Sequence, residues 1–112
     1  MADNWREQLR RGTLDLAVLL VIAPAPRYGL DILRHLEFTD LVLTEGTIYP
    51  LLARLEREGV LAGEWVEGEG PRARKYYSLT ARGRRRLADM RDEFHSVTTN
   101  IERLLKAVDG GR

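Results

Sequence analysis

The most regular hydrophobic pattern of the chain lies in its last third. Large apolar residues recur at alternating intervals of three and four positions: Leu87, Met90, Phe94, Val97, Ile101, Leu104 and Val108. This a/d heptad over three repeats predicts a helix from Thr80 to about Val108 with a coiled-coil seam along one face. Such a helix would be about 40 Å long at about 1.5 Å per residue. It would extend beyond a small domain, so we expect it to pair two copies of the chain.

Two helices are predicted before the chain's midpoint. The first should run from Asn4 to Ala23, because Asn4 and Glu7 have the spacing of a variant capping box and prolines follow the end. Its second half is apolar on nearly every side, which is typical of a helix at the centre of a small domain. A second, shorter helix is expected over residues 28–37, where the apolar positions form one face.

A third helix is predicted from Thr44 to Gly59. Threonine is a favourable residue before a first turn, and glycine is the usual residue after a last turn. Pro50 lies inside this helix and crowds the carbonyl of Gly46, so a slight bend is expected there. The apolar stripe that should face the core consists of Ile48, Leu51, Leu52 and Leu55.

A β-hairpin is predicted after the third helix. Residues 60–67 and 72–79 are rich in β-branched and aromatic side chains, and Gly68–Pro71 separates them. Three helices followed by a hairpin predict a mainly α fold, a winged helix-turn-helix with a two-stranded wing and a long C-terminal dimerisation helix. The predicted division is a DNA-binding domain over 1–79, a dimerisation helix over 80–108 and a disordered tail over 109–112.

Composition adds few constraints. The chain has 112 residues, a net charge of +1 and no cysteine, which excludes disulfides and thiolate sites. The longest apolar stretch, Leu14 to Ala25, is too short to cross a bilayer, and no secretory cleavage site follows the N-terminus. We therefore expect a cytoplasmic protein without contact to a membrane.

The distribution of charge is more informative than the total. Residues 31–69 carry nine acidic and three basic side chains, whereas residues 72–91 carry eight basic and one acidic. A locally basic surface attracts phosphates even when the whole molecule is nearly neutral. The arginines of 82–86 are equally compatible with a solvated helix face.

Four segments together carry a family resemblance. They are Arg11–Leu14, Tyr28–Gly29, the run over 43–58 and the run over 74–80. In these segments the chain resembles the PadR family of bacterial transcriptional regulators, and its single C-terminal helix resembles the short subfamily. The resemblance covers residues from about 9 to 87. It implies a homodimeric repressor whose DNA contacts include Tyr28.

The candidate DNA contacts lie on the third helix and the hairpin. On the helix they are off the apolar stripe, mostly in the N-terminal half that reaches base edges and phosphates in a recognition helix: Thr44, Gly46, Thr47, Tyr49 and Arg54. Arg54 could instead pair with Glu58 four positions later. On the hairpin the candidates are Arg72, Arg74 and Lys75. They could instead shield the edge of the hairpin or pair with Glu67 and Glu69.

A small-molecule effector is implied by the resemblance alone. In the short subfamily, aromatic residues near the dimer interface can line a flat pocket for planar aromatic compounds. Trp5 and Phe94 are the aromatic candidates by placement, although plain interface packing is the favoured interpretation of each. Trp65 is expected to fill either the wing or the core.

No other chemistry is indicated. His35 and His95 are isolated, so no metal site is predicted. No catalytic arrangement and no cofactor motif stands out, so we do not expect an enzyme. The predicted function is an effector-responsive repressor that binds a palindromic DNA operator as a homodimer. The alternative is a winged-helix and coiled-coil module that docks a protein partner without binding DNA.

Overall fold

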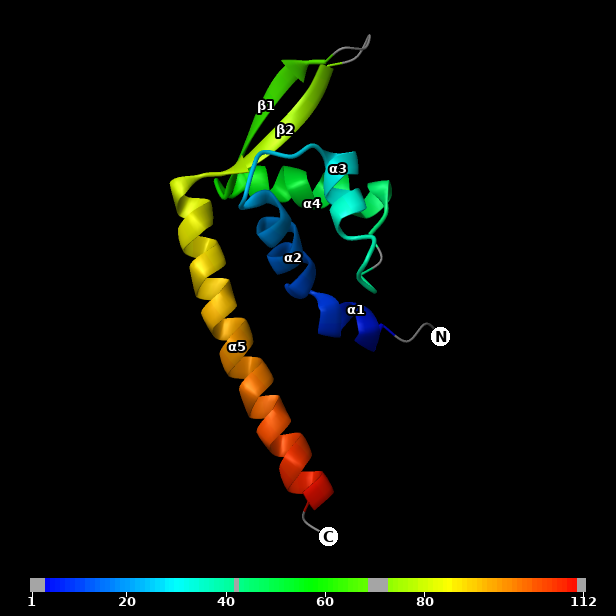
Figure 1. Ribbon diagram of the computed structural model, residues 1–112, viewed down its shortest axis with the longest axis vertical. Helices are drawn as coiled ribbons and strands as arrows, with labels where there is room; N and C mark the ends of the chain where they lie inside the picture. The colour runs from blue at the N-terminus through cyan, green and yellow to red at the C-terminus, as the bar shows by residue number, and fades with distance from the viewer. Residues whose placement is uncertain (1–3, 42, 69–72, 111–112) are drawn as a thin grey trace.

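The computed structural model describes residues 4–41, 43–68 and 73–110. It confirms the predicted fold, a mainly helical winged helix-turn-helix with a two-stranded wing and one long C-terminal helix (Figure 1). The elements in chain order are α1 (Trp5–Arg10), α2 (Thr13–Ile22), α3 (Gly29–His35), α4 (Glu45–Arg57), β1 (Leu61–Glu67), β2 (Ala73–Leu79) and α5 (Ala81–Gly110).

The prediction of one continuous helix from Asn4 to Ala23 is wrong. The chain breaks between α1 and α2 at Gly12, whose φ of 86° lies in the left-handed region that glycine adopts readily. The predicted capping box is also wrong, because the side chain of Asn4 makes no capping hydrogen bond to the helix.

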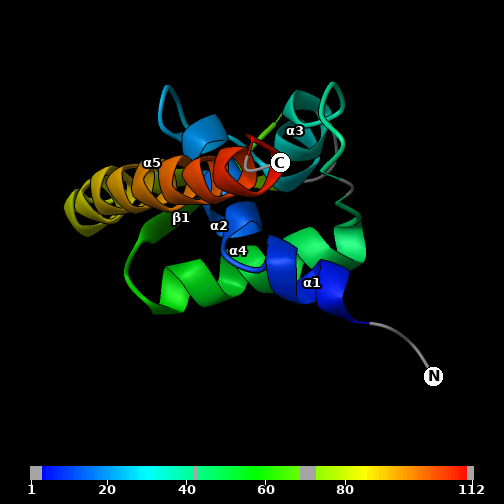
Figure 2. The ribbon, with the colours of Figure 1, turned by 90° about the horizontal axis from the view of Figure 1, so that it is seen from below.

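The core forms around α2, which lies in the middle of the head in both views (Figures 1 and 2). We use this name for the described residues 4–41, 43–68 and 73–80. This helix contacts α3, α5 and β2, as its apolar surface on nearly every side predicts. The stripe of α4 is confirmed as well: Ile48, Leu52 and Leu55 are fully buried, and Leu51 is nearly so. Pro50 lies within α4 without ending it.

The wing is an antiparallel hairpin whose register runs from Leu61 opposite Leu79 to Glu67 opposite Ala73. A further bridge joins Arg27, in the α2–α3 connection, to Tyr77 of β2. Trp65 lies on β1 and is 68% exposed, so of its two predicted places it occupies the wing and not the core.

Helix α5 starts from a junction that ties it to the end of α4. The Thr80 hydroxyl accepts a hydrogen bond from the Gly83 amide at 2.9 Å and donates one to the Gly59 carbonyl at 2.6 Å. This confirms the predicted cap at Thr80. The helix then projects from the head (Figure 1). It includes Asp109 and Gly110, which were predicted to belong to a disordered tail; the last two residues lie outside the described chain.

Candidate nucleic-acid interface

The N-terminal half of α4 presents one polar edge to solvent. Because its apolar stripe is buried, the predicted contacts on the other side of the helix are exposed: Thr44, Gly46, Thr47 and Tyr49. Thr44 occupies the N-cap position, but its side chain makes no capping bond, and its hydroxyl lies 3.4 Å from that of Thr47. Both hydroxyls and the first amides of the helix are therefore placed to bind phosphate oxygens.

Tyr49 links this edge to the start of α3. Its ring lies so close to Gly29 that a Cβ on the glycine would be 2.5 Å from the ring carbon Cε1. Only glycine accommodates the ring at this distance, which explains why the residue at position 29 is glycine. The ring stays 43% exposed, so Tyr49 packs against α3 and still faces outward.

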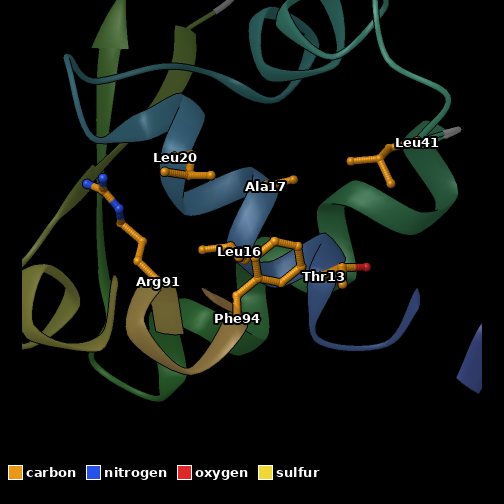
Figure 3. A pocket seen from close by; sticks show the side chains of 7 residues that line it. All are labelled: Thr13, Leu16, Ala17, Leu20, Leu41, Arg91 and Phe94. Carbon is orange, nitrogen blue, oxygen red and sulfur yellow. The ribbon is translucent and has the colours of Figure 1, made fainter. Parts of the chain in front are cut away.

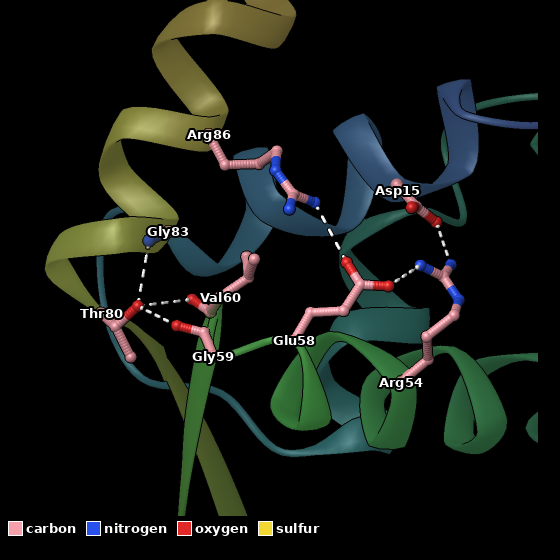
Figure 4. A network of polar contacts seen from close by, with 8 residues as sticks. All are labelled: Asp15, Arg54, Glu58, Gly59, Val60, Thr80, Gly83 and Arg86. Carbon is pink, nitrogen blue, oxygen red and sulfur yellow. Dashed lines mark hydrogen bonds and ion pairs between the residues drawn. The ribbon is translucent and has the colours of Figure 1, made fainter.

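Arg54 is engaged by carboxylates. Its guanidinium donates to Asp15 of α2 at 2.7 Å and to Glu58 at 3.2 Å (Figure 4). Glu58 also accepts from Arg86 of α5 at 3.1 Å. The pairing with Glu58 that the sequence allowed is present, and the contact with Asp15 was not predicted. Arg54 would have to leave both carboxylates to reach a phosphate.

This network joins three helices at the C-terminal half of α4. The guanidinium groups of Arg86 and Arg54 hold the pKa of the Glu58 carboxyl below its ordinary value. Hydrogen bonding to Asp15 raises the pKa of Arg54. The charged forms thus stabilise one another and fix α4 relative to α2 and α5.

Lys75 anchors the wing to α4. Its ammonium donates to Glu56 of α4 at 2.8 Å, not to Glu67 of the hairpin, and this bond raises the pKa of Lys75. The same ammonium lies 5.8 Å from the ring centre of Trp65 and 5.5 Å from that of Tyr77, whose own pKa burial raises. Lys75 is therefore occupied in holding β2 against α4.

Arg74 is on the opposite face of β2 and is exposed. Its guanidinium lies over the ring of Tyr28, 4.5 Å from the ring centre. Tyr28 and Arg74, two of the predicted DNA contacts, thus lie against each other. Arg72 lies outside the described residues.

The heptad face of α5 divides into two parts. Leu87 is buried in the core and Met90 packs against it, so the first turns of α5 cover the protein's own head. The remaining positions are from 48% to 74% exposed: Phe94, Val97, Ile101, Leu104 and Val108. We call these five residues the α5 ridge. Within the described chain nothing covers it.

An open apolar cavity of about 670 Å³ lies between α2 and α5. The Phe94 ring projects toward α2 on one side of it (Figure 3). The lining residues are Thr13, Leu16, Ala17, Leu20, Leu41, Arg91 and Phe94. The other predicted effector residue, Trp5, is on α1 and does not line this cavity; Arg6 stacks on its ring at 4.7 Å.

Sequence reasoning missed three side chains that make contacts at or behind this surface. Asp15 and Arg86 were overlooked because their partners lie 39 and 28 positions away, which no local spacing reveals. Arg34 was overlooked because no sequence pattern indicates its contact with Tyr28. It donates to the Tyr28 hydroxyl at 2.9 Å.

The described residues form neither a metal site nor a membrane-spanning helix. None of their histidine and carboxylate groups forms a set of three that could hold a metal ion. None of the helices over these residues is long and apolar enough to cross a membrane.

Comparison with known proteins gives consistent matches. Residues 18–89 match the model of the transcriptional regulator PadR-like family. The chain is 36% identical to a PadR family transcriptional regulator from Eggerthella lenta, with a TM-score of 0.81 over 92% of this chain and 90% of that one. It is 34% identical to a PadR-like transcription factor from Bacteroides fragilis, with a TM-score of 0.78 and coverage of 91% and 99%. An uncharacterized protein of Lysinibacillus sphaericus is 26% identical over 107 residues, 93% of this chain and 98% of that protein.

Proposed function

The chain belongs to the PadR-like family of transcriptional regulators, and on that premise we propose that it is a homodimeric repressor that leaves its operator when an effector binds. The family consists of DNA-binding regulators and not of enzymes. The observation that carries the proposal is the exposed N-terminal edge of α4 with Arg74 of the wing beside it. This favours DNA binding over the docking of a protein partner alone.

The edge of α4 enters the major groove in this proposal. Thr47 and Tyr49 face the base edges or the sugars, and the Thr44 hydroxyl and the first amides of the helix bind a phosphate. Gly46 leaves room for close approach, since a Cβ there would meet only the Thr44 hydroxyl, at 3.7 Å. Arg74 follows the DNA backbone. Arg54 and Lys75 support α4 and the wing from behind.

Two copies pair through the α5 ridge. Five large apolar residues in one row, left exposed by a single chain, are what a coiled-coil partner covers. A two-fold dimer presents two α4 helices to two half-sites about 34–36 Å apart, so the operator is palindromic. Pairing also doubles the small DNA surface that one such module contacts.

The effector is a planar aromatic compound bound in the α2–α5 cavity. Its volume of about 670 Å³ suits a small organic ligand, and its lining is mostly apolar. Phe94 belongs both to this cavity and to the α5 ridge. A ligand there would bind one dimer geometry better than another and so change the distance between the two α4 helices.

A gel-shift titration tests the DNA-binding part. We expect the full chain to retard a duplex that carries the region upstream of its own gene. If the dimer neutralises about six phosphates, log affinity should fall with log salt at a slope of about −5. Light scattering on the free protein should give twice the mass of the chain. Absence of retardation at low salt would instead support the docking module.

A further inference from the structure

The ring of Tyr28 is surrounded by two arginines from different parts of the chain. Arg74 of β2 lies over the ring at 4.5 Å, and Arg34 of α3 lies 5.8 Å from the same ring centre while it donates to the hydroxyl at 2.9 Å. Tyr76 packs edge-on against the ring, with the two ring centres 5.4 Å apart and the planes at 71°. The two guanidinium groups are thus held by one half-buried side chain.

The backbone fixes this ring in place. Arg27, which precedes Tyr28, exchanges two hydrogen bonds with Tyr77 of β2, at 3.0 and 2.8 Å. The α2–α3 connection therefore runs as a short extra strand along β2. Since side chains alternate along a strand, Arg74 and Tyr76 share the face of β2 that meets Tyr28. The start of α3 and the wing together therefore hold Tyr28, Arg74 and Tyr76 in place.

Neither arginine has a carboxylate partner within the part of the chain that the structure describes. Three other cations near α4 do: Arg54 pairs with Asp15, Lys75 with Glu56, and Arg86 with Glu58. Even Asp31, on the same helix as Arg34, pairs with Arg27 and lies beside His35. Two exposed guanidinium groups without counter-charge form the local positive site that a phosphate would neutralise.

Stacking leaves the binding edges of the arginines available. A guanidinium has five N–H donors in its plane. Arg34 donates from one of its terminal nitrogens to the Tyr28 hydroxyl. A guanidinium that lies over an aromatic face keeps its N–H edges directed sideways, where they can take two oxygens of a phosphate. Tyr28 therefore orients both guanidinium groups while occupying a donor of Arg34 alone.

The position of this group relative to α4 suggests its ligand. Gly29, next to Tyr28, packs against the ring of Tyr49 on the exposed edge of α4. In helix-turn-helix proteins the helix before the recognition helix crosses the sugar-phosphate backbone. With α4 in the groove, the start of α3 and the adjoining face of β2 meet that backbone.

We propose that Tyr28, Arg34 and Arg74 form a phosphate clamp that holds the DNA backbone beside the groove entered by α4. Arg34 is the new DNA-contacting residue, and Tyr28 acts mainly as a positioning residue for the two arginines. The clamp contributes affinity and register but not base specificity. It rests on the proposed function, because it presumes that α4 faces DNA.

The test measures affinity against salt for the full chain on a duplex of arbitrary sequence, long enough for two half-sites. Each lost phosphate contact lowers the magnitude of the slope of log affinity on log salt by about 0.9. Arg34→Gln should therefore lower it by about 1.8 for a dimer. Arg103→Gln removes the same charge from the outer face of α5 and should leave the slope unchanged.

A second variant separates phosphate contact from support of the fold. Arg34→Lys keeps a positive charge but loses the planar fork, so the salt slope should stay near that of the unchanged protein while affinity falls. Equal slopes for Arg34→Gln and the unchanged protein would overturn the clamp, as would the same loss of slope in Arg34→Lys. If the unchanged protein itself fails to bind DNA at low salt, the proposed function is wrong instead.

Discussion

Gly83, in the first turn of α5, packs against the backbone of Val60, the residue before β1. A Cβ at this position would overlap the carbonyl oxygen of Val60 and lie 3.1 Å from its carbonyl carbon. Both atoms are backbone, so neither can rotate away. The same residue donates its amide to Thr80 and so helps to start the helix.

We expect Gly83→Ala to lower the free energy of unfolding by about 1–3 kcal/mol, as overpacking usually does. Gly46→Ala is the matched control, because the nearest atom to its Cβ is the Thr44 hydroxyl at 3.7 Å. That change should be neutral or should stabilise α4 by up to about 1 kcal/mol. Chemical denaturation of both variants provides the comparison, and equal stabilities would contradict the close packing at Gly83.

Glu58 gives the protein a specific sensitivity to acid. Its carboxyl pKa is lowered in the folded protein, first by the hydrogen bond from Arg86 and then by that from Arg54. A lowered folded pKa means that the network stabilises the fold above the pKa of the unfolded chain. This contribution is lost as pH falls through the folded pKa.

Glu58→Gln should therefore cost about 1 kcal/mol or less at neutral pH, since the group is partly exposed. Its unfolding free energy should also fall less steeply than that of the unchanged protein below about pH 5. Urea denaturation at a series of pH values measures both effects. Glu102→Gln, on the exposed part of α5, controls for the loss of one charge. Parallel pH curves for Glu58→Gln and the unchanged protein would count against the network.

At the scale of elements, α5 serves two purposes along its length. Its first turns pack on the core through Leu87, and its later turns expose the α5 ridge. If the ridge pairs two chains, a charge in its middle has no partner to neutralise it. Val97 is half exposed in the single chain, so a substitution there leaves the fold of the head intact.

Val97→Asp should weaken self-association at least about a hundredfold, because two unpaired carboxylates would be buried per dimer. Ser96→Asp introduces the same side chain one position away, on the outer face, and should leave the dimer intact. Light scattering at a series of concentrations measures the difference. A dimer that persists in Val97→Asp would show that the ridge is not the pairing surface.

Hydrophobic periodicity was sufficient to predict most elements but not every boundary. The heptad predicts α5, and the stripe of α4 predicts which of its faces is exposed, because both patterns lie within one helix. The break at Gly12 was missed because an isolated glycine is often tolerated inside a helix. Only the backbone conformation, with φ of 86°, distinguishes a break from a continuation.

The partners of charged residues were much less predictable than the elements. Arg54 and Glu58 are four positions apart on one helix, and their pairing was considered from the sequence. The bonds of Arg54 to Asp15 and of Lys75 to Glu56 span 39 and 19 positions and depend on how helices and wing pack. Sequence alone could not tell that these two cations are occupied while Arg74 is available.

In the whole molecule, the cavity, the α5 ridge and α4 are physically connected. Phe94 lines the cavity and begins the ridge, and Arg86, two turns earlier on α5, bonds to Glu58 at the end of α4. The longest dimension of the chain is 64 Å, and most of it follows α5. In the proposed mechanism, a rotation of α5 at the cavity would move both the α5 ridge and the contact with the end of α4.

The effector proposal leads to a prediction about Phe94 and Trp5. A neutral planar fluorophore such as 1-aminoanthracene should bind the dimer in the α2–α5 cavity and reduce its affinity for DNA. Phe94→Ala should weaken this binding at least about tenfold, since an aromatic contact and its buried area are both lost. Trp5→Ala should have little effect, because Trp5 does not line the cavity.

Fluorescence titration measures dye affinity, and light scattering checks that Phe94→Ala remains a dimer through the rest of the ridge. Unchanged dye affinity in Phe94→Ala would place the ligand elsewhere, because no other aromatic side chain lines this cavity in the described chain.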